Sequence, residues 1–166
     1  MYLQEDAIMP RHRIDAEEKL ISVGRELLLS DDPRAFNMRS VAKQCGISLG
    51  TVYRYFGSTE LLLRSIIKND WNKFIFKLRD SIDEDAPPEE SARILYFYLR
   101  EFKGLYKKDP LCRIQGLEDR DTYEETIKEL CSVTRLPRFV VEVLYAMSDL
   151  QGISYNRIES DIKKLL

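Results

Sequence analysis

The chain has 166 residues, of which 44% are apolar, enough for the core of one domain or of two small ones and too many for general disorder. No apolar run reaches the roughly eighteen residues that a membrane-spanning helix needs, and the acidic start MYLQEDAIMP lacks the hydrophobic region of a signal peptide. The cysteines Cys45, Cys112 and Cys131 are odd in number and far apart, which excludes a disulfide framework and favours a cytoplasmic location.

The net charge of −2 is unevenly distributed along the chain. Residues 1–68 hold 10 Lys or Arg against 9 Asp or Glu, whereas residues 69–166 hold 16 against 19. Several basic residues of the first part lie in or near the segment 36–63, while most of its acidic residues precede that segment. A small basic face on an acidic chain usually needs doubling by dimerisation to bind DNA well.

Apolar residues at helical spacing predict an all-α chain, and no segment alternates as a strand does. The first helix is expected to begin after Asp15, because Asp15 and Glu18 have the spacing of a capping box. The sequence Ser-Asp-Asp-Pro at 30–33 is expected to end it.

Two short helices are expected next, separated by a glycine turn. Asn37 is a suitable N-cap for the first of them, and Gly46 is suited to the left-handed position that follows its last residue. Ser48 can cap the second, which Gly57 closes, and a longer helix is expected at about 59–82. The residues expected to face inward are Met38, Val41, Ala42, Cys45, Val52 and Phe56.

The remaining elements are also predicted to be helical. The acidic, proline-containing segment 83–90 is a loop, and helices are expected at about 89–107 and 121–133, with 109–120 ambiguous. Pro137 is suited to a helix first turn, and apolar periodicity continues to the end of the chain. Gly152 and Ser154 either break this last helix or allow a neighbour to pack closely.

The spacing of the two short helices is that of a helix-turn-helix, in which the second helix enters the major groove of DNA. Thr51 is suited to a base or a phosphate, and the hydroxyls of Tyr53 and Tyr55 are suited to phosphate oxygens. Arg39 is close enough to reach a guanine. The same spacing also occurs in proteins that never bind DNA, but Tyr53-Arg54-Tyr55 is hard to explain as an ordinary solvated face.

The segment resembles the DNA-binding domain of the TetR family of bacterial regulators. The resemblance is carried by Met38-Arg39-Ser40-Val41-Ala42, Cys45-Gly46-Ile47-Ser48, Gly50-Thr51-Val52-Tyr53-Arg54-Tyr55-Phe56 and Glu60-Leu61-Leu62. It implies a homodimer on an operator with two half-sites, and a ligand-binding C-terminal domain. Motif and resemblance together give these candidate DNA-binding residues: Arg39, Ser48, Leu49, Gly50, Thr51, Tyr53, Arg54, Tyr55 and Thr59.

Thr59 is a departure from the family pattern, which has a phosphate-contacting lysine at that position. The hydroxyl keeps a hydrogen bond but loses the charge. Arg11, His12 and Arg13 could compensate from a flexible arm, or form an ordinary solvated tail.

We therefore expect a helix-turn-helix domain at 1–58, with a flexible tail at 1–13, and a helical effector-binding and dimerisation domain at 59–166. Aromatic residues of the second domain either line an effector pocket or fill the core, and the core is favoured for most of them. The last helix offers a surface for dimerisation, although its residues could equally belong to the core: Val140, Val141, Leu144, Met147, Ile153, Ile158 and Ile162.

The expected function is that of a homodimeric transcriptional repressor, binding a palindromic double-stranded DNA operator and relieved by a small-molecule ligand. The alternative is a co-regulator of the same scaffold whose partner is a protein and whose specific DNA binding is weak or absent. An enzyme is not supported: His12 is the only histidine, and metal-ligand spacing and catalytic motifs are missing. We expect no cofactor, no metal and no membrane contact.

Overall fold

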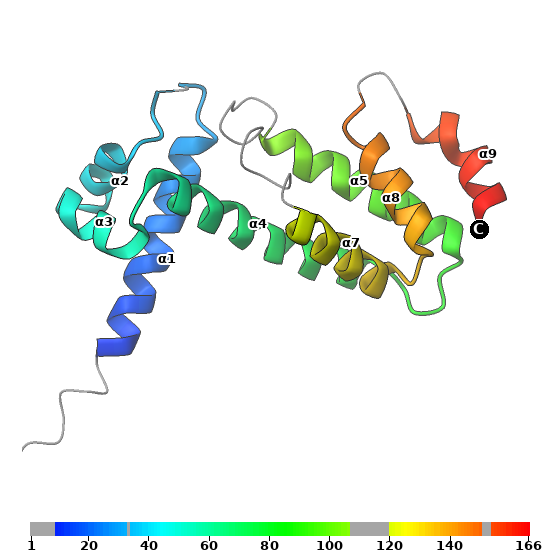
Figure 1. Ribbon diagram of the computed structural model, residues 1–166, viewed down its shortest axis with the longest axis horizontal. Coiled ribbons are helices and arrows are strands. Elements are labelled where there is room, and N and C mark those ends of the chain that lie inside the picture. Colours follow the sequence, from blue (N-terminus) through cyan, green and yellow to red (C-terminus); the bar gives the residue numbers. More distant parts are fainter. Residues whose placement is uncertain (1–8, 33, 107–119, 151–153) are drawn as a thin grey trace, which may run out of the picture. The chain divides into compact units, whose positions relative to one another are not determined.

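The computed structural model describes residues 9–32, 34–106, 120–150 and 154–166, and Figure 1 shows them as helices joined by turns and loops. The prediction of an all-α chain is confirmed, since the described ranges contain helices and no strand. The chain divides into two compact units, Met1–Asn69 and Asp70–Leu166, and α4 (Thr59–Ser81) contributes residues to both.

Unit 1 consists of α1 (Met9–Leu28), α2 (Met38–Cys45), α3 (Leu49–Phe56) and the first half of α4. Its core is formed by buried side chains from all four helices. At Gly24, a Cβ would lie 2.9 Å from Ile66 Cδ1, so the glycine lets the buried face of α1 approach α4 closely. The buried side chains of this core include Leu20, Val41, Val52, Phe56, Leu62, Leu63 and Ile66.

The expected start of the first helix is wrong. α1 begins at Met9 rather than after Asp15, so Asp15 is a helix-interior residue and caps nothing. Pro10 is compatible with the earlier start, because the first N–H groups of a helix have no intrahelical partner and the missing N–H of proline costs little there. Met9–Arg13 are therefore helical where a flexible tail was expected, and residues 1–8 lie outside the described residues.

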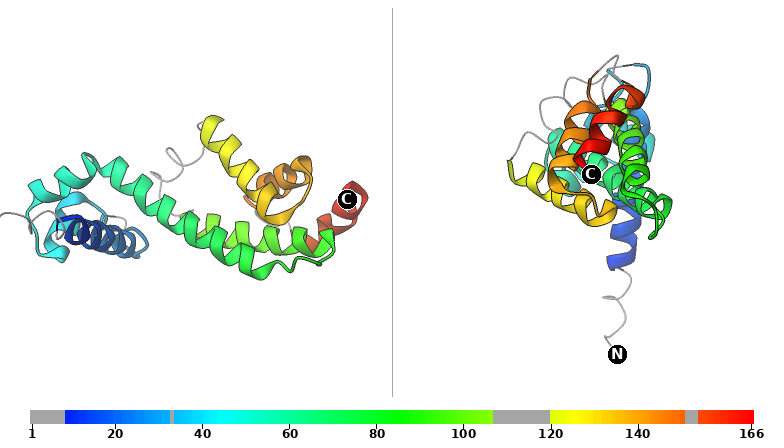
Figure 2. Two further views of the ribbon diagram at one scale, coloured as in Figure 1. Left: turned by 90° about the horizontal axis from the view of Figure 1, so that it is seen from below. Right: turned by 90° about the vertical axis from the view of Figure 1, so that its right-hand side faces the viewer.

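Unit 2 contains the rest of α4 together with α5 (Pro88–Tyr106), α7 (Arg120–Thr134), α8 (Arg138–Met147) and α9 (Tyr155–Leu165). α5 packs against α7, α8 and α9, and Figure 2 shows these helices from two further directions. The ambiguous segment 109–120 lies outside the described residues except for Arg120, the first residue of α7. The innermost side chains of the unit are Leu78, Leu95, Tyr96, Leu99, Ile127, Leu130, Val140, Val141 and Leu144.

The end of the chain forms two helices rather than one. α8 ends at Met147 and α9 begins after Ser154, which agrees with the alternative that this region breaks the helix; Gly152 lies outside the described residues. The core role is confirmed for five of the residues considered for dimerisation, because they are buried inside unit 2. These are Val140, Val141, Leu144, Ile158 and Ile162.

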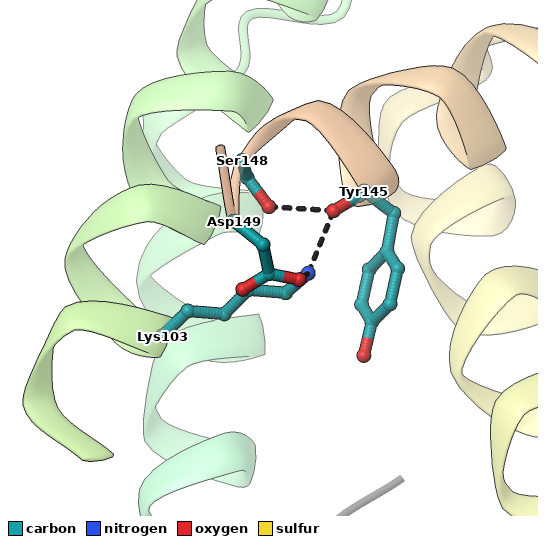
Figure 3. Close-up of polar contacts among 4 residues, drawn as sticks. All are labelled: Lys103, Tyr145, Ser148 and Asp149. Carbon is teal, nitrogen blue, oxygen red and sulfur yellow. Dashed lines mark hydrogen bonds and ion pairs between the residues drawn. The ribbon is translucent and has the colours of Figure 1, made fainter. Parts of the chain in front are cut away.

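The C-terminal end of α8 is held by a lysine from α5. Lys103 Nζ donates hydrogen bonds to the backbone carbonyl of Tyr145 and to Asp149 Oδ2, each at 2.6 Å, and lies 3.6 Å from the centroid of the Tyr145 ring (Figure 3). The Ser148 hydroxyl donates to the same carbonyl at 2.7 Å. The last carbonyls of a helix lack intrahelical partners and carry partial negative charge, so a cation is favourable there.

The turn between α7 and α8 contains Arg135, the one non-glycine residue with positive φ (59°) in the described part of the chain. Its backbone N–H donates to the Cys131 carbonyl at 2.9 Å and closes the end of α7. Its side chain donates from Nη1 to the Glu84 carbonyl at 2.9 Å, which fixes the loop that precedes α5. The strained backbone therefore occurs where one residue both ends a helix and contacts a neighbouring loop.

Candidate nucleic-acid interface

Hydrogen bonds at both ends fix the position of α2. As expected, Asn37 is its N-cap: Asn37 Oδ1 accepts the Ser40 N–H at 2.9 Å, and Asn37 Nδ2 donates to the Arg34 carbonyl at 3.1 Å. Gly46 follows the helix at φ 71°, and the Ile47 N–H donates to the Ala42 carbonyl at 3.0 Å. The predicted inward face is confirmed, because Met38, Val41, Ala42 and Cys45 are all buried.

α3 begins and ends where the sequence predicts. Ser48 has extended backbone (ψ 148°), and its Oγ accepts the Thr51 N–H at 3.1 Å. Gly57 at φ 71° ends the helix, and its N–H donates to the Tyr53 carbonyl at 2.7 Å. Ser58 then caps α4 by accepting the Leu61 N–H at 3.2 Å.

The buried face of α3 is narrow, and this decides which side chains remain outside. Val52 is fully buried and Phe56 is 5% exposed, one helical turn apart. The other residues of this eight-residue helix are exposed or half-exposed. Because only one edge of this short helix is buried, most of its side chains remain available to a partner. A recognition helix needs such exposed side chains to contact the major groove of DNA.

Each candidate DNA-binding residue can be placed on unit 1. Five are exposed: Arg39 on α2, Ser48 before α3, and Gly50, Tyr53 and Arg54 on α3. Four are half-exposed: Leu49, Thr51 and Tyr55 on α3, and Thr59 at the start of α4. None of the nine is buried, so the fold leaves the whole predicted set available.

Further basic side chains of unit 1 were not among the candidates. Lys43 on α2 is exposed, and so is Arg34 in the turn before α2. Lys19 on α1 donates to the Cys45 carbonyl at 3.4 Å, at the C-terminal end of α2. These residues lie outside the motif, and their exposure depends on how α1 and α2 pack. For Lys43 a signal does exist in the sequence: a helical-wheel projection of residues 38–45 places it away from the buried face.

Cys45 is part of the packed face of α2. It is 8% exposed, and burial raises the pKa of its thiol, with the positive charge of Lys19 acting in the opposite direction. A buried thiol with a raised pKa is a poor nucleophile, so Cys45 is a structural residue.

In unit 2, five of the described aromatic residues are buried in the core: Phe74, Tyr96, Phe102, Tyr106 and Tyr155. The Trp71 and Phe74 rings stack at 4.7 Å between centroids, and Phe102 lies 5.2 Å from each of them. Tyr106 donates a hydrogen bond of 2.7 Å to the buried Asp70 carboxylate, and Trp71 Nε1 donates to Glu129 at 2.8 Å. Three other aromatic residues are largely exposed: Phe76 at 73%, Phe97 at 53% and Phe139 at 46%.

Several polar groups of unit 2 make structural contacts. Arg138 on α8 contacts Glu124 on α7 and Glu142 on its own helix, both at 2.8 Å, and these hydrogen bonds raise the pKa of its guanidinium. Burial raises the pKa of Tyr145 above its usual range. Within the described residues, no three His, Cys, Asp or Glu side chains are placed to hold a metal ion, and no helix is long and apolar enough to span a membrane.

Comparisons with known proteins identify the N-terminal unit. Residues 20–66 match the family model described as bacterial regulatory proteins, tetR family. An HTH-type transcriptional regulator of Staphylococcus aureus (strain bovine RF122 / ET3-1) is 29% identical over 101 residues, which are 61% of this chain and 51% of that protein. The fatty acid metabolism regulator protein of Bacillus subtilis (strain 168) is 27% identical over 77 residues, 46% of this chain and 40% of that protein. The chain thus spans about half the length, or less, of these curated relatives.

Solved structures agree with the fold. A TetR-family transcriptional regulator from Vibrio parahaemolyticus has a TM-score of 0.55 at 17% identity, covering 90% of this chain and 96% of that one. A TetR-family regulator from Haemophilus influenzae has a TM-score of 0.53 at 17% identity, covering 92% and 95%. Two capped short helices that pack on each other, with the first of them also packed on α1, define a helix-turn-helix. The N-terminal unit is thus similar to the TetR family of bacterial regulatory proteins, and residues 20–66 carry the match.

Proposed function

We propose that the chain is a sequence-specific DNA-binding transcriptional regulator that uses α3 as its recognition helix. The supporting observation is that all nine candidate contact residues remain exposed or half-exposed while the fold buries the opposite edges of α2 and α3. A non-enzymatic role fits the family and the structural engagement of the polar groups described above.

The contact residues divide by chemistry. Tyr53, 46% exposed, offers a hydroxyl to a phosphate, and Arg54 beside it offers charge. Thr51 and Gly50 lie nearest the start of α3, the end that approaches base edges in a helix-turn-helix. Arg39, in the first turn of α2, is long enough to reach a base or a phosphate.

We further propose a homodimer that binds a palindromic operator and acts as a repressor relieved by a small ligand. One helix-turn-helix contacts too few base pairs to select an operator by itself. A two-fold symmetric dimer places a second copy on a second half-site and so doubles the number of contacts. α8 supports dimerisation through a second apolar stripe that is exposed or half-exposed, distinct from its buried one. The stripe and its continuation comprise Phe139, Val143, Ala146, Met147 and Leu150.

The proposed DNA contact is tested by Tyr53→Ala combined with Arg39→Ala. Both side chains are exposed, so the variant is expected to unfold at the wild-type temperature while losing specific operator binding. Each good contact of this kind contributes about 1–3 kcal/mol. Operator affinity measured by gel shift should fall at least about thirtyfold, and an unchanged affinity would show that α3 does not contact DNA.

The rival function is that of a co-regulator that binds a protein. It is favoured by the uncharged Thr59 and by the net charge of −2. A salt titration separates the two, because binding to phosphates weakens steeply as counterions compete. Sequence preference with a steep salt dependence supports the regulator; binding no tighter than to random DNA at low salt supports the co-regulator.

A further inference from the structure

Two hydroxyl groups are in direct contact on α3. Ser48 Oγ accepts the backbone N–H of Thr51 at 3.1 Å and lies 2.9 Å from Thr51 Oγ1. Ser48 is exposed and Thr51 is half-exposed, so both hydroxyls can be reached from solvent. Gly50 has no side chain to cover the pair, and a Cβ built there would lie 3.9 Å from Ser48 Oγ.

The contact allows two arrangements of the hydroxyl protons, because each hydroxyl has one proton and two acceptor sites. In the first, Thr51 donates to Ser48; both acceptor sites of Ser48 are then used, and Ser48 points its own proton outward while Thr51 presents only acceptor sites. In the second, Ser48 donates to Thr51, and Thr51 points its proton outward. The proton of Ser48 therefore decides whether Thr51 is a donor or an acceptor towards a partner.

A phosphate would select the first arrangement. Phosphate oxygens only accept hydrogen bonds, and they are the commonest partners of proteins on DNA. Ser48 precedes the helix, at the end where the helix dipole favours an anion, so the phosphate is expected at Ser48 and the base edge at Thr51. A Ser48 hydroxyl that donates to a phosphate cannot also donate to Thr51.

We propose that Ser48 is a positioning residue that makes Thr51 an obligatory hydrogen-bond acceptor, so that Thr51 selects a base with an amino group in the major groove. These bases are adenine, through N6, and cytosine, through N4; guanine and thymine present acceptors at the corresponding positions. The inference rests on the proposed function, since it requires α3 to lie in the major groove. It adds the class of base that one named residue reads and the neighbour that fixes this choice.

The test measures base preference at every operator position for the full-length chain and three variants. Operator duplexes selected by the wild-type protein are changed to each of the four bases in turn, and their dissociation constants are compared. The wild type should prefer adenine or cytosine at one position of each half-site by about three- to tenfold, the worth of a single hydrogen bond. Thr51→Val, which has the same shape but no hydroxyl, should lose that preference.

Two variants of Ser48 separate positioning from helix capping. Ser48→Gly removes the hydroxyl with little cost to the cap, and should reduce the preference at that position to within about twofold. Ser48→Asn keeps the cap, and its carboxamide oxygen can accept both the Thr51 N–H and the Thr51 hydroxyl proton, so the preference should persist. Ser58→Gly is the matched control: it removes the hydroxyl that caps α4 at a similarly small cost, and should leave the base preference unchanged.

The outcomes distinguish this inference from the proposed function. If the wild-type protein selects no sequence at all, both are overturned. If it selects an operator but Ser48→Gly keeps the full preference that Thr51→Val loses, Thr51 reads the base without Ser48 and the positioning role is wrong. A wild-type preference for guanine or thymine at the position sensitive to Thr51→Val also contradicts it.

Discussion

At the scale of single residues, the contact between Gly24 and Ile66 controls how closely α1 packs on α4. A Cβ at position 24 would lie 2.9 Å from Ile66 Cδ1, and Ile66 is fully buried with little room to turn away. Glycine in a helix interior is otherwise unfavourable, by about 1 kcal/mol relative to alanine. The missing Cβ of Gly24 therefore leaves the space that this contact needs.

This gives a prediction with a built-in control. Gly24→Ala is expected to lower the free energy of unfolding by about 1 kcal/mol, because overpacking of about 1–3 kcal/mol outweighs the gain in helix propensity. Ile66→Val removes the obstructing Cδ1 and costs about 0.5–1.5 kcal/mol by itself. In that background Gly24→Ala should become stabilising by about 1 kcal/mol. Equal effects of Gly24→Ala in the two backgrounds, measured by chemical denaturation, would contradict the contact.

At this scale, the residues at the ends of α2 and α3 could be predicted correctly from the sequence. Asn37, Gly46, Ser48 and Gly57 were all assigned to helix ends from their chemistry, and each has the predicted role. Capping depends on atoms within three or four residues, so the sequence holds the necessary information. The contact of Lys19 with the Cys45 carbonyl could not be predicted in the same way, since it depends on the packing of α1 against α2.

At the scale of elements, one predicted helix start is wrong, and one of the two alternatives left open for the end of the chain agrees with the structure. The capping-box pattern at Asp15 is compatible with a helix start, but the upstream residues continue the helix and the pattern has no effect. Apolar spacing continued through the end of α8, whereas the structure has two helices there. Periodicity reports which face is buried and does not report whether a helix is interrupted, so boundaries are the least predictable part.

The end of α8 gives an element-scale prediction. Lys103→Met removes a cation whose side chain is 10% exposed, together with its bonds to the Tyr145 carbonyl and Asp149. The free energy of unfolding is expected to fall by about 1.5–3 kcal/mol, the range for hydrogen bonds to charged groups. Asp149→Asn is the control: Asp149 is 55% exposed, so its loss should cost less than about 1 kcal/mol. Equal losses in the two variants would assign the stabilisation to the ion pair alone.

At the scale of the whole molecule, charge limits how tightly the chain can bind DNA. The sequence carries 26 Lys and Arg against 28 Asp and Glu, so attraction to phosphates must come from the local surface of unit 1. Thr59 is half-exposed at the start of α4 and carries no charge, so we expect it to add nothing to that attraction. Salt dependence measures this deficit directly, because each phosphate contact by a cation adds a fixed amount to the slope.

Thr59→Lys is therefore predicted to steepen the salt dependence of operator binding. The slope of log K against log salt should become more negative by about 0.9 for each half-site, hence by about 2 for a dimer. Thr59→Gln, which lengthens the side chain without adding charge, should leave the slope at the wild-type value. A Thr59→Lys slope equal to that of Thr59→Gln would place position 59 away from the phosphates.

Cys45 also provides a probe for transient opening of the helix-turn-helix, through the rate at which its thiol is alkylated. Its thiol is buried against the α2 core and its pKa is raised, so an alkylating reagent at neutral pH can react only while the domain is transiently open. Because Cys131 is partly exposed, the labelling rate has to be followed at Cys45 itself; compared with that of an unfolded peptide, it then gives the free energy of that opening. A partner that holds α2 and α3 in place would lower the alkylation rate of Cys45. The ratio of the rates with and without the partner would measure how strongly binding suppresses the opening of these helices.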